Sequence, residues 1–310
     1  MPEGAFIHRL GAFAAAAALA ISLTGGAQAQ TIPESPDPIR LGVADWTGQH
    51  ITTYIAGFIL EDMGYNVEYV TAAVHPSAMA LADGNLSASL EWYSNSIGEF
   101  LPKLIDSGEV EYLGELGIAA RDGWIVPAYM EEHCPGLPEW DALVDCAEVF
   151  ATPESFPDGR LLAYPIGWGD RSIRLVENED VPFIAVPAGS EGALISELRS
   201  AAQREAPILL MLWEPHWIMT EIPMMWIEKP QEIIERYSFE IPTLFKAGWP
   251  GMKDKWPMAH QFLKNYQING EIQAELMLQI DHEGVPLEEA VGTWVEENRD
   301  FWEPMVPTAG

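Results

Sequence analysis

The sequence is poor in basic residues. It has 16 lysines and arginines against 47 aspartates and glutamates, which gives a formal net charge of −31. A chain with this charge repels nucleic acid and anionic lipid surfaces, so neither is an expected partner. The acidic residues are spread along the chain without long runs, and we interpret them as a device for solubility. Attraction of small cations is the alternative, but salt screens it beyond about 8 Å.

Long apolar runs are also scarce, except near the start. Arg9 precedes an alanine-rich run from Leu10 to Leu23, and Ala27-Gln28-Ala29 comes shortly after it. A basic residue, an apolar run of about 14 residues and an A-x-A site predict a secretory signal peptide over residues 1–29. A membrane anchor is the alternative, but the run is shorter than the roughly 20 residues that a span needs. We expect an exported protein whose mature chain begins at Gln30.

Cysteine occurs only twice, at Cys134 and Cys146. In an exported chain an even number of cysteines indicates a disulfide. The bond would close a loop of about 13 residues and contribute on the order of 3 kcal/mol in the chain-entropy model. A metal site formed by both sulfurs and His133 is the alternative.

Signatures of catalysis are missing. The sequence has no G-x-S-x-G motif, no phosphate-binding glycine loop and no H-E-x-x-H spacing among its seven histidines. We therefore expect that the protein is not an enzyme. A secreted glycosidase is the best enzymatic alternative, because sugars stack on tryptophan and carboxylates carry out the hydrolysis. A sugar-binding module is a third reading, but it would need polar side chains between the aromatic ones.

One acidic stretch has the composition of a cation site. Glu177-Asn178-Glu179-Asp180 places several oxygen ligands in an expected loop, and Ca²⁺ takes such groups. The spacing is not that of an EF-hand and no glycine provides the turn, so we favour a solvated loop. A structural Ca²⁺ held by Glu177, Asn178 and Asp180 is the alternative, and no cofactor is required.

Strand and helix patterns alternate along the chain, which indicates parallel α/β sheets. In the first part the predicted elements are Ile39–Val43, Gln49–Met63, Val67–Val70, Pro76–Ala82 and Leu86–Leu90. Gly64 is expected to end the first helix. In the middle they are Arg160–Ile166, Ser172–Glu177, Phe183–Val186 and Glu191–Arg204. The last part is helix-rich, with amphipathic patterns over Ala259–Tyr266, Gly270–Asp281 and Pro286–Asp300.

In the stretch from Pro207 to Trp217, an apolar run of about six residues lies between Pro207 and Pro215, and it predicts a strand buried on both faces. A middle α/β block with a segment on each side indicates two lobes, one formed by residues 30–127 plus 217–310 and the other by residues 128–216. The expected crossings between them are strands over Trp124–Tyr129 and Met211–Ile218.

Four tryptophans occupy the same position relative to predicted strands. Trp46, Trp92, Trp168 and Trp213 each come just past the carboxyl end of a strand, where ligands bind in open α/β sheets. Aromatic faces attract cations. A quaternary ammonium has no N–H groups and carries its charge on apolar methyls, so tryptophan faces satisfy both properties. The pattern predicts an aromatic cage for a methylated amine.

Together with the signal peptide, the segments Glu91-Trp92-Tyr93, Gly167-Trp168-Gly169 and Trp213-Glu214-Pro215-x-Trp217 resemble the periplasmic substrate-binding proteins of glycine betaine/choline-type ABC importers. The resemblance extends from about Ile39 to Phe301. It implies a two-lobed type II-like binding-protein fold with a hinge of two crossing strands, a periplasmic monomer, and delivery of the ligand to a membrane permease. It also implies that Trp46, Trp92, Trp168 and Trp213 form the cage.

The expected ligand follows from one departure from that family. A betaine site needs cationic or N–H groups for the ligand's carboxylate, but the crossing region offers Glu131 instead. A carboxylate at the cage would repel betaine and suit trimethylamine N-oxide, whose oxygen can share a proton with Glu131. The chain most resembles family members that bind this compound, which implies trimethylamine N-oxide as ligand. Glycine betaine or choline is the alternative.

Overall fold

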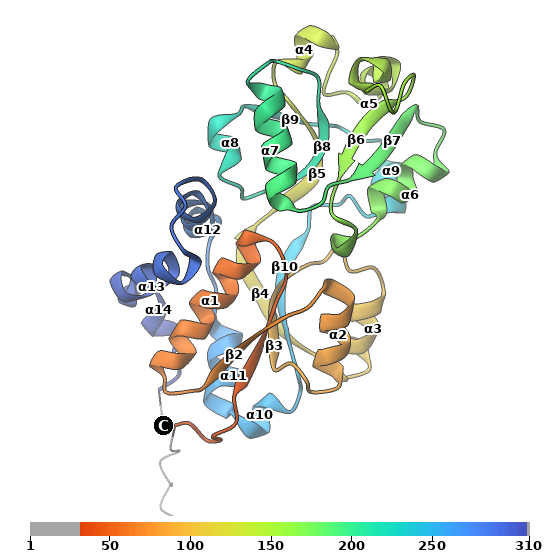
Figure 1. The fold of residues 1–310 in the computed structure, drawn as a ribbon. Coiled ribbons are helices and arrows are strands. Elements are labelled where there is room, and N and C mark those ends of the chain that lie inside the picture. Colours follow the sequence, from red (N-terminus) through yellow and green to blue (C-terminus); the bar gives the residue numbers. More distant parts are fainter. Residues whose placement is uncertain (1–31, 309–310) are drawn as a thin grey trace, which may run out of the picture.

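The computed structural model describes residues 32–308, and the expected signal peptide lies outside that range. The described chain forms two lobes, each built around a five-stranded sheet with helices packed around it (Figure 1). This arrangement confirms the predicted two-lobed α/β class. Among the described helices, none combines the length and the apolar character of a membrane span.

Lobe 1 holds the sheet with the strand order β2-β1-β3-β10-β4. The strands are β1 (Ile39–Val43), β2 (Val67–Thr71), β3 (Ala88–Tyr93), β4 (Glu111–Ala119) and β10 (Thr243–Gly248). The helices are α1 (Thr47–Asp62), α2 (Val74–Ala82), α3 (Phe100–Asp106), α10 (Met252–Lys255), α11 (Pro257–Asn265), α12 (Gly270–Met277), η3 (Leu278–His282), α13 (Leu287–Glu297), α14 (Arg299–Trp302) and η4 (Glu303–Met305). The first three strands are parallel as predicted, whereas β10 lies antiparallel between β3 and β4.

Lobe 2 holds the sheet with the strand order β7-β6-β8-β5-β9. The strands are β5 (Arg121–Pro127), β6 (Gly159–Ala163), β7 (Phe183–Pro187), β8 (Leu209–Glu214) and β9 (Met224–Trp226). The helices are α4 (Met130–His133), α5 (Trp140–Asp145), η1 (Ala147–Phe150), η2 (Ile166–Trp168), α6 (Arg171–Asn178), α7 (Glu191–Ala202), α8 (Ile218–Glu221) and α9 (Gln231–Tyr237).

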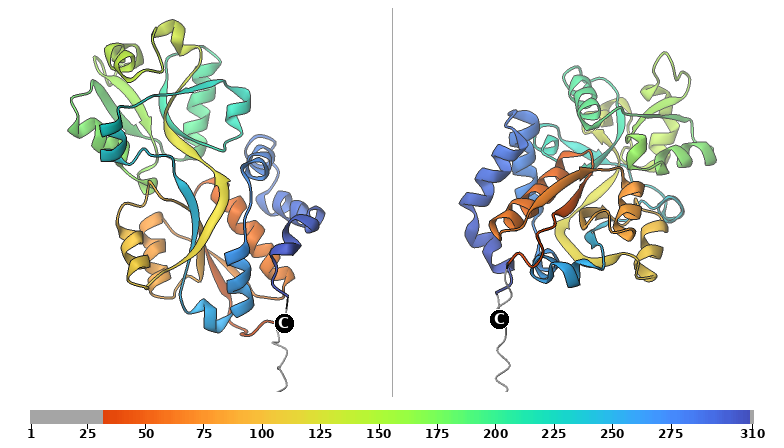
Figure 2. Two further views of the ribbon diagram at one scale, coloured as in Figure 1. Left: turned by 180° about the vertical axis from the view of Figure 1, so that it is seen from behind. Right: turned by 60° about the horizontal axis from the view of Figure 1, so that its bottom comes forward.

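The chain changes lobes at different points from those expected. Strands β5 and β9 belong to the sheet of lobe 2, so the crossings lie at Ala120 and at residues 238–242 instead of at residues 127 and 217. The segments Trp124–Tyr129 and Met211–Ile218 therefore lie within lobe 2. The apolar run at Met211 belongs to β8, which has β6 on one side and β5 on the other, and this central position accounts for its burial. Strands β4 and β10 pair with each other and run toward lobe 2 at the crossing (Figure 2).

Helix α1 shows how the local sequence sets the elements that carry the site. Ile51, Ile55 and Ile59 recur at helical spacing and are fully buried against the sheet of lobe 1. The predicted glycine stop is confirmed: Gly64 has φ +97° and donates to the Glu61 carbonyl, and the next amide donates to Leu60. These two bonds form a Schellman motif, which fixes the end of the helix.

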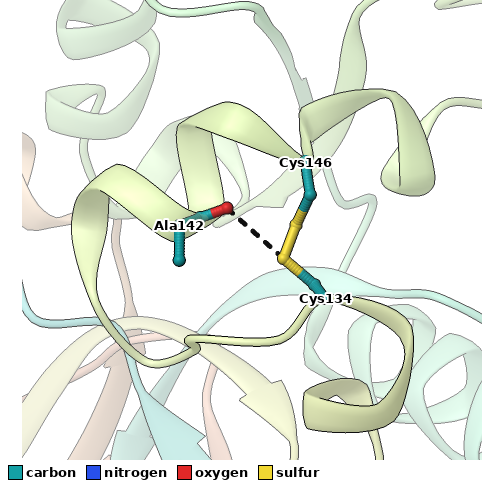
Figure 3. The surroundings of a disulfide bond; sticks show 3 residues. All are labelled: Cys134, Ala142 and Cys146. Atoms are coloured by element: carbon teal, nitrogen blue, oxygen red, sulfur yellow. Dashed lines mark hydrogen bonds between the residues drawn. A yellow bond between two sulfur atoms is a disulfide. The ribbon is translucent and has the colours of Figure 1, made fainter.

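The predicted disulfide is present in lobe 2. Cys134 follows α4 and Cys146 follows α5, and their Cα atoms lie 6.1 Å apart (Figure 3). The Sγ atom of Cys134 also lies 3.3 Å from the carbonyl oxygen of Ala142. The bond joins two helices of six residues or fewer, which are too short to be stable without tertiary support.

Candidate functional site

An aromatic cavity of about 50 Å³ lies between the lobes. Lobe 1 contributes Trp46, Glu91, Trp92 and Tyr93, and lobe 2 contributes Asp122, Tyr164, Trp168 and Trp213. The structure therefore brings together all four tryptophans that the sequence pattern singled out. By the same volume measure a single water molecule needs about 10–15 Å³, so the cavity has room for a group of only a few heavy atoms.

Three of the tryptophans form one continuous aromatic cluster. The ring centroids of Trp46 and Trp168 lie 5.4 Å apart at an interplanar angle of 67°, and those of Trp168 and Trp213 lie 5.5 Å apart at 78°. Tyr164 packs on both lobe 2 tryptophans, at 5.5 and 5.8 Å, and Tyr93 approaches Trp46 at 6.4 Å. The steep angles make the rings the walls of a box, in which each face meets the edge of its neighbour.

Trp92 takes a different part in the cavity. Its indole N–H donates to the Ser89 carbonyl at 3.0 Å, and its ring belongs to a separate apolar cluster that includes Leu101 and Phe245. Among the described residues it makes no ring pair with the other three tryptophans. Trp92 therefore lines one edge of the cavity from within the core of lobe 1.

Glu91 is the buried carboxyl of the site, and it lies at a break in the sheet. Trp92 pairs with Phe245 and Leu90 pairs with Lys246, so Glu91 is an extra residue on β3, with φ +89°. This bulge places a non-glycine residue in the left-handed region, a conformation that costs free energy and is concentrated at functional sites.

Three side chains donate to the Glu91 carboxyl. The Trp46 indole donates to Oε1 at 2.8 Å, while the Thr52 hydroxyl and the Gln273 amide each donate to Oε2 at 2.7 Å. The side chain is buried, with 3% of the residue exposed. Burial raises the pKa of Glu91 to about 7, and the three donors oppose this rise. The carboxyl thus changes charge near neutral pH and fixes the Trp46 ring.

Asp122 is the second carboxylate of the cavity, and its charge is compensated. It forms a buried ion pair with Arg171, and it accepts from the Asn95 amide at 2.7 Å. In the sheet of lobe 2 it stands directly opposite Trp213. The bond from Asn95 also links the lobes, since Asn95 follows β3. Asp122 therefore adds polarity to the cavity with little net charge.

The predicted role of Glu131 does not agree with the structure. Glu131 lies exposed on α4, after the end of β5 that points away from the cavity, and it does not line the site. Residue Asp122, near the start of β5, is the one that reaches the cavity. Glu91 is the glutamate whose buried carboxyl lines the cavity. The sequence places Glu91 next to one of the four tryptophans, in Glu91-Trp92-Tyr93. In a chain with 47 acidic residues, however, an acid beside an aromatic residue is too common to identify a site residue.

The proposed calcium ligands show no cation-binding arrangement. Glu177 and Asn178 end α6, where the Asn178 amide donates to the Arg174 carbonyl at 2.6 Å. Their neighbour Glu179 pairs with Arg236 at 2.6 Å. Within residues 32–308 no three or more His, Cys, Asp or Glu side chains are grouped so that they could hold a metal ion, and Glu177 and Asp180 are therefore not part of such a group.

Two lobes that enclose an aromatic cavity define a ligand-binding protein of the two-lobed class. The chain belongs to the OpuAC family, the substrate-binding domain of ABC-type glycine betaine transport systems, whose family model matches residues 37–297. This membership confirms the resemblance seen in the sequence. It also identifies the chain as a transport substrate-binding protein, which favours the expectation of no catalysis.

Two characterised relatives share part of the sequence. The trimethylamine N-oxide-binding protein of Pelagibacter ubique is 30% identical over 211 residues, which is 64% of this chain and 66% of the relative. The glycine betaine/carnitine transport binding protein of Listeria monocytogenes is 31% identical over 111 residues, or 36% of this chain and 35% of the relative. The matched segments thus span just under two thirds and about one third of these relatives.

Solved structures share the fold. A choline-binding protein of an ABC transporter, in complex with choline, matches with a TM-score of 0.77 at 19% identity, over 88% of this chain and 92% of that one. The closed glycine betaine complex of lactococcal OpuAC matches with a TM-score of 0.73 at 17% identity, over 87% and 100%. At these identities the likeness supports the fold alone.

Proposed function

We propose that the protein is the periplasmic substrate-binding component of an ABC importer, and that it captures trimethylamine N-oxide between its lobes. The observation that carries the proposal is the aromatic box, in which Trp46 of lobe 1 meets Trp168 and Trp213 of lobe 2 around a small cavity. The lobes would close on the ligand and release it to a membrane permease. The predicted signal peptide supports the location, and the protein is expected to act as a monomer.

The box suits the methylated end of such a ligand. Tryptophan faces attract a cation with about 0.5–1 kcal/mol when exposed and 2 kcal/mol or more when water is excluded. The methyl groups also gain from burial, because they are apolar. Glu91 places a carboxyl at the same cavity, where its ionised form would attract a positive centre. A primary amine would fit poorly, since its N–H groups would lose water without finding enough acceptors.

The oxygen end of the ligand has donors available. The hydroxyls of Tyr93 and Tyr164 and the indole N–H of Trp213 are buried in cavity-lining residues, and none has a hydrogen-bond partner within the described chain. Burial raises the pKa of both tyrosines well above the usual value, so they remain protonated donors. An N-oxide oxygen accepts such bonds strongly and would satisfy groups that are otherwise costly to bury.

The same features favour trimethylamine N-oxide over the alternatives. The small volume suits a short ligand, and a betaine carboxylate would meet Glu91 and Asp122. Asp122 is neutralised by Arg171, but that arginine is then engaged and is a poor partner for a second carboxylate. The hydroxyl of choline could use the same donors, so choline remains the alternative. The name of the Pelagibacter relative supports the same ligand.

The cage is tested by comparing two tryptophan variants. Trp168→Ala removes the ring that joins the walls of the two lobes and should weaken binding of trimethylamine N-oxide about thirtyfold or more in calorimetry, since about 2 kcal/mol or more of contacts is lost. Trp294→Ala is the matched control, because Trp294 of α13 packs on Phe301 of α14 and does not line the cavity. Both variants should keep the far-UV spectrum of the folded protein. If Trp168→Ala kept the wild-type affinity, the Trp168 ring would not be part of the binding site.

A further inference from the structure

Two hydrogen bonds tie lobe 1 to lobe 2 on either side of Trp46. On one side the Asp45 carboxylate accepts from the indole N–H of Trp168. On the other side the backbone N–H of Thr47 donates to Oε2 of Glu191 at 2.8 Å. Trp168 lines the cavity, and Asp45 is the chain neighbour of the cavity residue Trp46. Glu191 does not line the cavity and is the first residue of α7. The turn that carries one cage wall is therefore held by the opposite lobe on both flanks.

Glu191 also contacts the lobe 2 wall of the cage through a histidine. Its Oε1 lies 3.3 Å from Nε2 of His216. The Nδ1 atom of His216 accepts from the Ile218 backbone N–H at 3.1 Å, so in the neutral ring the proton sits on Nε2. The contact between Nε2 and Glu191 Oε1 is one of proximity, since neither atom makes a hydrogen bond within the described chain. The imidazole lies 4.9 Å from the Trp213 ring at 77°. A continuous line of contacts thus joins Trp213 to Trp46 behind the cavity.

The carboxylate of Glu191 is well suited to accept the hydrogen bond from the Thr47 N–H. Thr47 is the first residue of α1, a helix of 16 residues, and its N–H has no acceptor within the helix. The positive end of the helix dipole favours a negative group at this point. The Glu191 residue is 8% exposed, so water competes little for the bond. Charge-assisted bonds of this type are stronger than neutral ones.

We propose that Glu191 is a positioning residue that latches the two lobes shut: by holding Thr47 from across the interface, it sets Trp46 against Trp168 and slows release of the ligand. The ligand's identity rests on the proposed function, but the latch does not. Opening the lobes separates Glu191 from Thr47, and the cage walls move apart with them. Thr47 has a second hydrogen bond, within lobe 1: its hydroxyl donates to the carboxylate of Asp281, in η3, at 2.8 Å.

Proline at residue 47 removes the latch donor and leaves the helix start intact. Proline lacks the N–H, it is tolerated at the first position of a helix, and Trp46 already has the extended conformation (φ −126°, ψ 147°) that a residue before proline requires. Thr47→Ala keeps the N–H and loses only the hydroxyl bond to Asp281. We expect Thr47→Ala to weaken trimethylamine N-oxide binding about two- to threefold and Thr47→Pro about tenfold beyond that. Equal affinities of the two variants would overturn the latch.

Variants of Glu191 test the other partner. Glu191→Ala should weaken binding about tenfold and raise the ligand dissociation rate, whereas Glu191→Gln retains an acceptor for Thr47 and should recover part of the loss. Glu197→Ala is the control on the same helix, because Glu197 pairs with Arg160 of its own lobe and should leave affinity unchanged. The double variant Thr47→Pro with Glu191→Ala should bind no more weakly than the worse single variant. Additive losses would show that the two residues act separately and would contradict the proposal.

A failure of the ligand assignment would be distinguishable. If wild type binds none of trimethylamine N-oxide, choline and glycine betaine, the proposed function is wrong, and small-angle scattering of the ligand-free protein then tests the latch. In this proposal the latch also holds part of the ligand-free population closed, so Thr47→Pro should open the lobes and increase the radius of gyration relative to Thr47→Ala. An unchanged radius would overturn the latch whatever the ligand is.

Discussion

At the scale of residues, the candidate site combines aromatic faces, which attract cations, with a carboxyl that is costly to ionise. Glu91 is almost completely buried, and only the donors from Trp46, Thr52 and Gln273 keep its charge accessible near neutral pH. A positive ligand centre beside it would favour the ionised form. Glu91 orients the Trp46 ring through its hydrogen bond with the indole N–H, and in the proposed function it also supplies a negative charge beside the ligand's positive centre.

This leads to a pH dependence with a definite sign. Burial raises the pKa of Glu91 to about 7, and a cation bound beside it would lower this pKa, so binding should release a proton. The affinity for choline, a permanent cation, should rise up to about tenfold between pH 6 and pH 8 and level off above that. Calorimetry in two buffers with different protonation enthalpies measures both the affinity and the proton release.

Glu91→Gln should remove this pH dependence, because the amide does not titrate. Glu131→Gln is the control, since Glu131 lies exposed on α4 away from the cavity, and it should keep the wild-type profile. A flat wild-type profile, or a slope that survives in Glu91→Gln, would show that another group titrates.

At the scale of elements, each lobe positions its cage wall where a strand gives way to other structure. Trp46 lies between β1 and α1, and Trp168 ends the short helix η2 after β6. Trp92 and Trp213 are instead the penultimate residues of β3 and β8. The sequence pattern could locate all four, because parallel strands deliver their carboxyl ends to one edge of a sheet.

Other elements could not be predicted from local pattern. Strand β10 has Lys246 at its centre, and this residue is fully buried because its Nζ donates to the backbone carbonyls of Lys264 and Tyr266. A buried lysine breaks the apolar run by which a central strand is recognised. The bulge at Glu91 and the tyrosine pair at Tyr93 and Tyr164 depend on pairing and packing between distant segments. For this reason the sequence indicated the aromatic walls but misplaced the carboxyl and the lobe crossings.

The disulfide is an element-scale feature that should affect stability and leave binding unchanged. It links α4 to α5 across a sequence separation of 12 residues, and neither helix lines the cavity. The double variant Cys134→Ser with Cys146→Ser should lower the free energy of unfolding by about 3 kcal/mol. In denaturant titrations, reductant should bring wild type to the stability of the variant and leave the variant unchanged. Equal stability of oxidised wild type and variant would contradict a stabilising bond.

At the scale of the whole molecule, the proposed site needs both lobes. Trp46 comes from lobe 1 and Trp168 and Trp213 from lobe 2, so the box exists only when the lobes meet. Contacts between Asp45 and Trp168, Thr47 and Glu191, and Asn95 and Asp122 connect the lobes around it. The gain from the aromatic contacts, less the lost freedom of the ligand, is consistent with micromolar affinity.

The most direct measurement compares trimethylamine N-oxide with tert-butanol, which has nearly the same shape but no charge on its central atom. Calorimetric titration of the wild-type protein should give micromolar binding for the N-oxide and no detectable binding for the alcohol, because the cage selects the charged methylated centre and not its size alone. Absence of heat with the N-oxide, choline and glycine betaine alike, or binding of tert-butanol as tight as that of the N-oxide, would contradict the account.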